Sequence, residues 1–149
     1  MSTRALLRGI KAAIDADNGV TGLYTAVSGR VYLSRRTTRE SDGGTSLFPY
    51  LVVEVVSDDP LGEFSKTVVE RILVQFSVFD NSDGNSPDTC AQIKGKVQTL
   101  FDGDSSTLDL SAFGFTTAYL VRSGGGFGPM RVDGVWQATQ DYVAVFSTP

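Results

Sequence analysis

The segment from Lys66 to Asp80 constrains the fold most, because apolar and polar side chains alternate along most of its length. This alternation predicts a long β-strand whose two faces differ in character. One face carries Ile72, Val74, Phe76 and Val78, and the other carries Arg71, Leu73, Gln75, Ser77 and Phe79. Such a strand is stable only beside other strands and beneath a covering layer, so we expect a sheet at the centre of the fold.

The other periodic segments supply partners for this strand. The helical spacing of Leu6, Ile10 and Ile14 predicts a helix from Thr3 to about Asp17, and a second helix is predicted at about 87–102. Further strands are predicted at about 30–33, 48–58, 115–123 and 135–147. The order α-β-β-β-α-β-β predicts an α+β fold, in which two helices pack on one face of a mostly antiparallel sheet of four to five strands.

Three segments lack periodicity and are expected to be connections within one domain of 149 residues. Residues 34–46 (SRRTTRESDGGTS) and 124–131 (GGGFGPMR) are predicted to be extended loops, and 58–65 (DDPLGEFS) a hairpin connection. The glycine run lacks the spacing of a phosphate-binding loop, which favours a flexible hairpin. Residues 80–85 (DNSDGN) lack the alternate acids and following Glu of a calcium loop, which favours a turn. The acids of 58–65 are interpreted as solvated hairpin residues in preference to metal ligands.

Composition argues against an enzyme. The chain has no histidine and one cysteine, Cys90, so the commonest general base and the commonest zinc ligands are missing. A pair of carboxylates stays open as a catalytic device, but most of the 17 acids fall in predicted turns or solvent-facing positions. We therefore predict no enzymatic activity, no cofactor and no metal. Cys90 is expected to be a buried apolar residue rather than a disulfide partner.

Charge and hydropathy limit the cellular location and the partners that we expect for this chain. No apolar run approaches the length that crosses a bilayer, and the first residues lack the continuous apolar core of a secretory signal, so we expect a protein made in the cytoplasm without a membrane partner. The net charge of −4 disfavours a general nucleic-acid binder. An acidic wall is nevertheless suited to a channel through which DNA slides.

The order of elements, with particular residues in particular places, resembles the tail-completion (tail-terminator) proteins of long-tailed bacteriophages. The matching pieces run from about Ala5 to Ser147: ALLRGIKAAIDAD followed by VTGLY, GRVYLSR, FPYLVVEVVSDD, ERILVQFSVFDNS, DTCAQIKGKVQTLFDG and VWQATQDYVAVFS. The arginine-bearing loop 34–46 and the glycine run after Ser123 depart from the pattern.

This resemblance implies a virion protein of the tail–neck region. It implies a homo-oligomeric ring, usually a hexamer, at the head-proximal end of the tail tube. Such a ring stops polymerisation of the tail-tube protein and joins the tail to the head–neck connector protein, while DNA passes through the centre without sequence-specific binding. The alternatives are a head-side neck component and, from another class, a small cytosolic ligand-binding or enzymatic domain, which would show a deep pocket with converging polar groups.

Three arginines are the first candidate interface residues. Arg35, Arg36 and Arg39 fall in the predicted loop close to Arg30. They are open to three interpretations: a solvated loop, an arm that pairs with acids of a neighbouring subunit or the tube, or a contact to DNA phosphates. If the arm interpretation is right, changing all three to Glu blocks assembly and leaves the chain folded, which size-exclusion chromatography would show.

The other candidate interface residues follow from apolar character. The segments LVVEVV and DYVAVFS are apolar on both faces, although two helices cover only one face of a sheet. The second face packs against long loops or against neighbouring subunits. Glu54, within the first of these strands, would then need a partner such as an arginine of another subunit. Phe127 and Met130 are unusual for a solvated glycine-rich segment and suit an interface anchor.

Overall fold

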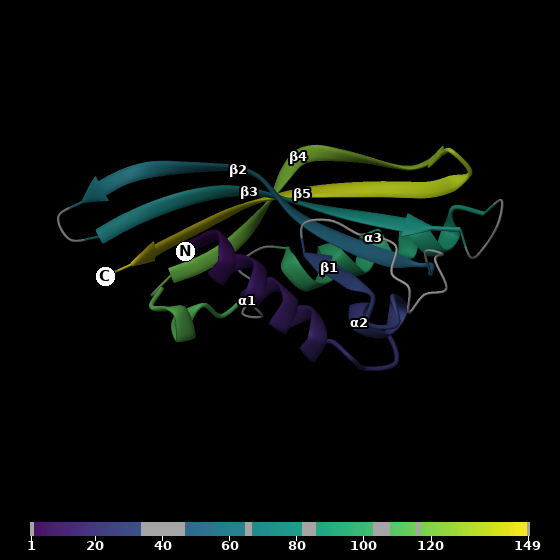
Figure 1. Cartoon of the computed structure of the whole chain (residues 1–149), viewed down its shortest axis with the longest axis horizontal. Coiled ribbons are helices and arrows are strands. Elements are labelled where there is room, and N and C mark those ends of the chain that lie inside the picture. The colour runs from purple at the N-terminus through teal and green to yellow at the C-terminus, as the bar shows by residue number, and fades with distance from the viewer. Residues whose placement is uncertain are drawn as a thin grey trace.

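The computed structural model describes residues 2–33, 47–64, 67–81, 86–102, 108–115 and 117–148 (Figure 1). Its elements, in chain order, are α1 (Ser2–Ala16), α2 (Leu23–Ala26), β1 (Val31–Leu33), β2 (Tyr50–Phe64), β3 (Thr67–Asp80), α3 (Asp88–Phe101), the 3₁₀ helix η2 (Ser111–Phe113), β4 (Thr117–Val132) and β5 (Val135–Thr148). The α+β fold is therefore confirmed, with α2 and η2 as short additions that the sequence did not predict.

The five strands form one sheet in the order β1-β2-β3-β5-β4. β1 pairs with β2 in parallel, and the other neighbouring pairs are antiparallel. The helices α1, α2 and α3 all lie on one side of this sheet (Figure 1). One face is thus covered by helices, as expected, and the other carries none of the described helices.

The core lies between the helices and the covered face. Every residue of the apolar side of β3, from Ile72 to Val78, is buried there. In the register of β3 with β5, Val74 lies opposite Tyr142 and Ile72 opposite Ala144, so both strands present this face to the helices. The Phe76 ring packs against Phe101 of α3 at 5.1 Å and against Tyr142 at 5.5 Å between centroids. The alternation seen in the sequence therefore gives the core its central layer.

Cys90 belongs to this core. Its side chain is fully buried on α3, and its thiol donates a 3.8 Å hydrogen bond to the Val78 carbonyl. Burial raises its pKa to about 11, and the charge of Asp80 adds to the effect while Lys94 opposes it. At neutral pH the thiol is protonated, as a structural residue would be.

Two segments predicted to be connections are strands instead. Most of 58–65 belongs to β2, which pairs with β3 as far as Phe64↔Thr67. Residues 124–131, predicted to be an extended loop, belong to β4. Register shifts between Arg122 and Gly126 and between Phe127 and Met130 show bulges, and Gly126 and Gly128 adopt φ of +116° and +90° there. The glycines therefore form bulges in β4, and the strand continues beyond them. The predicted loop 34–46 lies outside the described residues.

The long strands give the molecule two hairpins. The β4–β5 hairpin turns at Asp133–Gly134, where both residues have positive φ, as two-residue hairpin turns require. The ends of the β2–β3 hairpin and of the β4–β5 hairpin lie at opposite ends of the long axis (Figure 1). None of the described helices is long and apolar enough to cross a membrane.

Candidate assembly interface

The helix-free face is the side of the sheet that points away from α1, α2 and α3. Register assigns its members, because residues directly opposite each other on paired strands share a face. Three rows cross it: Tyr50, Phe79, Gln137 and Met130; Val52, Ser77, Thr139 and Phe127; and Glu54, Gln75 and Asp141. A further row contains Leu73, Val143 and Val121. This face therefore combines residues from four of the strands.

Aromatic rings make one end of the helix-free face rigid. Tyr50 stacks on Phe79 at 4.9 Å between centroids and meets the edge of Tyr32 at 5.9 Å. Phe48, just before β2, lies 5.4 Å from Tyr50. The rings come from three strands and one connection, so they hold the β1–β2–β3 part of the sheet together without a covering helix.

Apolar side chains on β4 are exposed on the same face. Val121, Phe127 and Met130 keep 49%, 41% and 47% of their surface accessible to solvent. The sequence singled out Phe127 and Met130 as interface anchors, and the register places both on this face together with Val121. A group of large apolar side chains on one strand is a common mark of a contact surface.

A polar row lies between the row that contains Phe127 and the row that contains Val121. Glu54 is opposite Gln75, and Gln75 is opposite Asp141. The Gln75 amide donates a hydrogen bond to Asp141 Oδ1 at 3.1 Å. Glu54 is exposed and makes no hydrogen bond or ion pair with the residues that the structure describes. Its pairing with an arginine of another subunit stays a prediction.

The candidate arginines divide into two groups. Arg35, Arg36 and Arg39 lie outside the described residues. Arg30 is described and has an internal role, because its guanidinium donates to the carbonyls of Pro49 and Phe48, both at 2.9 Å. These bonds hold the segment that leads into β2 against the segment between α2 and β1, so Arg30 has a structural role.

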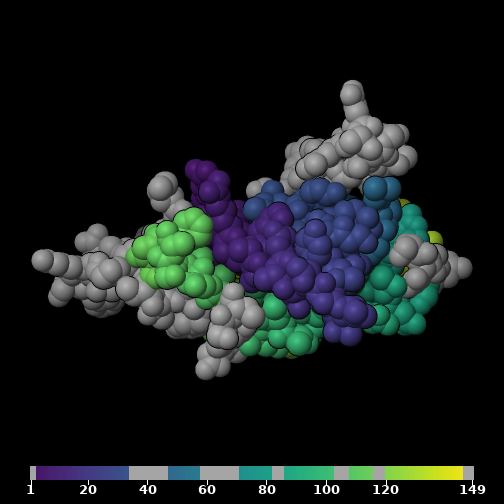
Figure 2. Space-filling model, turned by 90° about the horizontal axis from the view of Figure 1, so that it is seen from below, coloured from purple at the N-terminus to yellow at the C-terminus, as the bar shows by residue number. Residues whose placement is uncertain are grey.

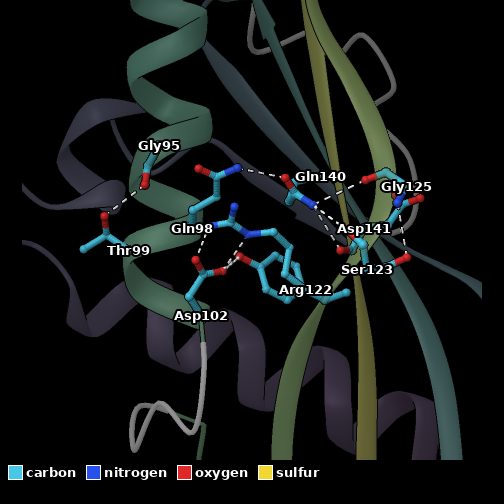
Figure 3. Close-up of polar contacts among 10 residues, drawn as sticks. Gly95, Gln98, Thr99, Asp102, Arg122, Ser123, Gly125, Gln140 and Asp141 are labelled. Atoms are coloured by element: carbon cyan, nitrogen blue, oxygen red, sulfur yellow. Dashed lines mark hydrogen bonds and ion pairs between the residues drawn. The ribbon is translucent and has the colours of Figure 1, made fainter.

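A second polar cluster, on the helix-covered side, was missed by the sequence analysis. Arg122 of β4 donates to both carboxylate oxygens of Asp102, and the Tyr142 hydroxyl donates to Asp102 Oδ1 at 2.6 Å (Figure 3). One turn earlier on α3, Gln98 donates to Gln140 Oε1 at 2.8 Å, and the Gln140 amide reaches the Ser123 and Gly125 carbonyls (Figure 3). Asp102 lies just past the helix end and Arg122 within a strand, so no short spacing announces their contact.

The pKa values of Asp102 and Tyr142 indicate a structural role for this cluster. Burial alone would raise the pKa of Asp102, but the hydrogen bonds from Arg122 and Tyr142 outweigh it and lower that pKa below 3.8. Burial, together with the bond to Asp102, raises the pKa of Tyr142 far above its usual value. The carboxylate is therefore permanently charged and the phenol permanently protonated near neutral pH. The cluster ties α3 to the β4–β5 hairpin and offers no group that gains or loses a proton there.

Metal chemistry finds no support in the described parts of the chain, where no group of three or more Cys, Asp or Glu residues could hold an ion. The pKa values that are shifted belong to paired structural groups or to the buried thiol. The helix-free face is therefore the best candidate for a functional surface.

Comparison with known proteins shows the fold and no more. No protein-family model matches this chain, and no curated protein matches it. Among solved structures 25 chains match. One of them aligns with 98% of this chain and 96% of its own length at a TM-score of 0.54, with 14% sequence identity. The alignment spans nearly all of both chains, so the likeness concerns the overall α+β fold.

Proposed function

We propose that this chain is a structural subunit of a phage particle, of the tail-completion class. In this function it forms a ring at the head-proximal end of the tail tube, ends tube polymerisation and joins the tail to the neck connector. It works by shape and contact, without an enzymatic step. The proposal combines the resemblance of the sequence with the surface just described.

The observation that carries this proposal is the helix-free face. The described helices pack on one side of the sheet, and Val121, Phe127 and Met130 are exposed on the other, which supports a subunit whose second face meets other chains. The aromatic rings of β1, β2 and β3 supply a rigid base for such a contact. The Glu54 carboxylate, which has no partner among the residues that the structure describes, provides a polar group that a partner's cation would match.

Ring formation and tube capping test the proposal together. Size-exclusion chromatography with light scattering measures the mass of the purified chain, and electron microscopy follows tail tubes assembled from the same phage's tube protein with and without it. We expect a ring mass in solution or on the tube, and tubes of limited length with added density at one end. A chain that stays monomeric and leaves tube length and tube ends unchanged overturns the proposal.

A gene-order observation is independent of purification. A tail-tube gene next to the gene of this chain supports the tail-completion class. A neighbourhood of portal and capsid genes alone would favour the head-side neck component.

A further inference from the structure

Each outer edge of the sheet contains a stretch that pairs with no other strand of the described chain. In the order β1-β2-β3-β5-β4, β4 forms one edge of the sheet. At the other edge, β1 pairs with β2 only from Leu51 to Val53, so the rest of β2, as far as Phe64, has no described strand on its outer side. Such edges expose backbone N–H and C=O groups that can pair with another chain.

The other half of each edge is blocked. Register shifts interrupt β4 between Arg122 and Met130, and Pro129 in this part has no backbone N–H. On β2, the short strand β1 covers the first residues. Bulges, prolines and short edge strands are common ways in which proteins prevent an edge from pairing. The regular part of the β4 edge is therefore Thr117–Arg122.

The register places the two open stretches at the same level of the sheet. Directly opposite residues connect Val121 of β4, through β5 and β3, to Ser57 of β2. In the same way, Thr117 is connected to Gly62. The start of β4 and the end of β2 also lie towards the same end of the long axis (Figure 1). A copy placed beside this one can therefore bring the two stretches together without a large shift along the strands.

Strand direction suits this pairing. β2 and β5 run in one direction and β3 and β4 in the other, because each neighbouring pair among them is antiparallel. When copies stand side by side in one orientation, β4 of one copy meets β2 of the next in the antiparallel sense. Val121, which is 49% exposed, and Ser57, which is exposed, then become cross-strand neighbours on the helix-free face.

Two bulges and a proline limit the part of β2 that can pair. Register shifts lie between Val55 and Ser57 and between Pro60 and Gly62, so residues 57–60 are the regular part. Pro60 has no N–H and can contribute only its carbonyl. Bulges increase the twist of a strand and are frequent at sheet edges and at the rims of barrels. They therefore also suit a sheet that curves from one copy to the next.

The described segment that leads into β4 packs on the helix layer. A Cβ on Gly9 of α1 would overlap Leu110 Cδ2, so only glycine lets Leu110 pack directly on this helix. Figure 2 shows the two parts of the chain side by side, with α1 in purple and residues 108–115 in green. Leu110 is buried by this contact, which holds the segment against α1.

We propose that neighbouring copies join through their sheet edges, with the Thr117–Arg122 stretch of one copy lying antiparallel beside residues 57–60 of the next. Backbone hydrogen bonds supply the affinity, and the register places Val121 opposite Ser57. The contact joins two different edges, so it is heterologous, which is the type that closes into rings. The inference rests on the proposed ring and names one of its subunit contacts.

Cross-linking in the assembled protein tests the proximity. Chains carrying Val121→Cys are co-expressed with tagged chains carrying Ser57→Cys and treated with a short bis-maleimide, while the buried Cys90 stays unreactive. The matched control replaces Ser57→Cys with Val20→Cys, an exposed position outside the sheet. We expect mixed dimers from the first pair in clear excess over the control. Equal yields in an assembly of confirmed ring mass overturn the contact.

Paired charges test the register. A chain with Val121→Lys and Ser57→Lys places like charges opposite each other at every joint, whereas a chain with Val121→Lys and Ser57→Glu places opposite charges there. The Lys–Glu chain should associate about tenfold more tightly than the Lys–Lys chain, because opposed charges favour strand pairing and like charges disfavour it. Both chains lose the same valine, so that loss cancels. Within one chain β3 and β5 separate the two positions, so urea denaturation should give similar stabilities.

The outcomes separate the inference from the proposed function. Equal association of the two charge variants, in rings of normal mass, overturns the edge contact and leaves the ring function standing. Cross-links between two Val121→Cys chains in excess over the mixed dimers show that two β4 edges pair about a two-fold axis, which also overturns it. A wild-type chain that neither forms rings nor caps tubes overturns both.

Discussion

The two faces of the sheet are built from the same strands and are used differently. On the helix-covered face, Phe76, Val74 and Tyr142 are buried beneath α1 and α3. On the helix-free face, Glu54 of β2 is exposed, and Phe127 and Met130 of β4 keep more than two fifths of their surface accessible. Alternation along each strand separates the two roles residue by residue.

This difference predicts which substitutions affect folding and which affect binding. A residue of the covered face is held by packing, so its replacement acts on the free energy of unfolding. A residue exposed on the helix-free face has few internal contacts, so its replacement acts on what the chain binds. Substitutions on neighbouring strand positions can therefore separate folding from assembly.

The largest expected effect comes from Phe76→Ala. The ring fills the space between Phe101 and Tyr142, and its loss leaves a cavity, so the free energy of unfolding should fall by about 3–5 kcal/mol. Urea denaturation followed by circular dichroism measures it. Phe79→Ala, three positions along the same strand on the opposite face, is the matched control and should lose clearly less, because Phe79 is only partly buried. Equal losses would contradict the division of the two faces.

A smaller effect is expected from the buried thiol of the covered face. The folded pKa of Cys90 is about 11, above its usual value of 9.0, because burial disfavours the thiolate. Because the pKa is raised on folding, the neutral thiol stabilises the fold fully at pH values below the unfolded pKa. This stabilisation is lost as the pH rises through the folded pKa. The difference in stability between wild type and Cys90→Ala should therefore shrink between pH 9 and 11, by on the order of 1–3 kcal/mol.

Urea titrations of both proteins at pH 8, 9, 10 and 11 measure this difference and cancel the titration of the other groups. Thiol reagents provide a second measurement, since they should label Cys90 only after unfolding. Rapid labelling of the folded chain would show that α3 does not shield this side of the sheet.

The Asp102 cluster should give a still smaller, oppositely directed pH effect. The folded pKa of Asp102 lies below 3.8, so the contribution of this carboxylate to stability is complete above that value. It is lost as the pH falls through the folded pKa. Stability below about pH 4 should fall less steeply for Asp102→Asn than for wild type, as urea titrations at pH 3 to 7 would show. The difference should be small because Asp102 and Arg122 keep 38% and 44% exposure, where water screens ion pairs. Identical slopes would indicate that the cluster forms no effective ion pair.

The sequence predicted one face of the sheet better than the other. The period of two in β3 and the helical periods of α1 and α3 identified Phe76, Cys90 and Ile10 as core residues, because burial leaves a regular pattern in the sequence. The 124–131 segment was predicted wrongly, since the glycines that suggest a loop also form bulges, and only pairing with β5 distinguishes the two. The Arg122–Asp102 contact was out of reach, because it depends on how α3 lies against β4.

The candidate site shows the same division. Phe127 and Met130 were recognised because large apolar residues are unusual among glycines, yet their place on one face with Val121 follows only from the register. A small cavity lined by Arg4, Arg8, Phe113 and Phe115 was not anticipated, because its two walls lie far apart in the sequence.

The smallest expected effect on folding comes from the helix-free face, where the effect on assembly should be large. The double variant Phe127→Ser, Met130→Ser removes two exposed apolar side chains, so its free energy of unfolding should stay within about 0.5 kcal/mol of wild type per substitution. If the two residues anchor a subunit contact, association should weaken by more than about thirtyfold, the equivalent of about 2 kcal/mol for an anchor residue.

Val20→Ser is the matched control, because Val20 is 96% exposed in the connection between α1 and α2 and lies on neither face of the sheet. Removing this side chain should change neither stability nor association. Light scattering over a dilution series measures association, and urea denaturation measures stability. A double variant that assembles like wild type would mean that the exposed apolar residues of β4 are solvated in the assembly, and the ring would then have to be built from other surfaces.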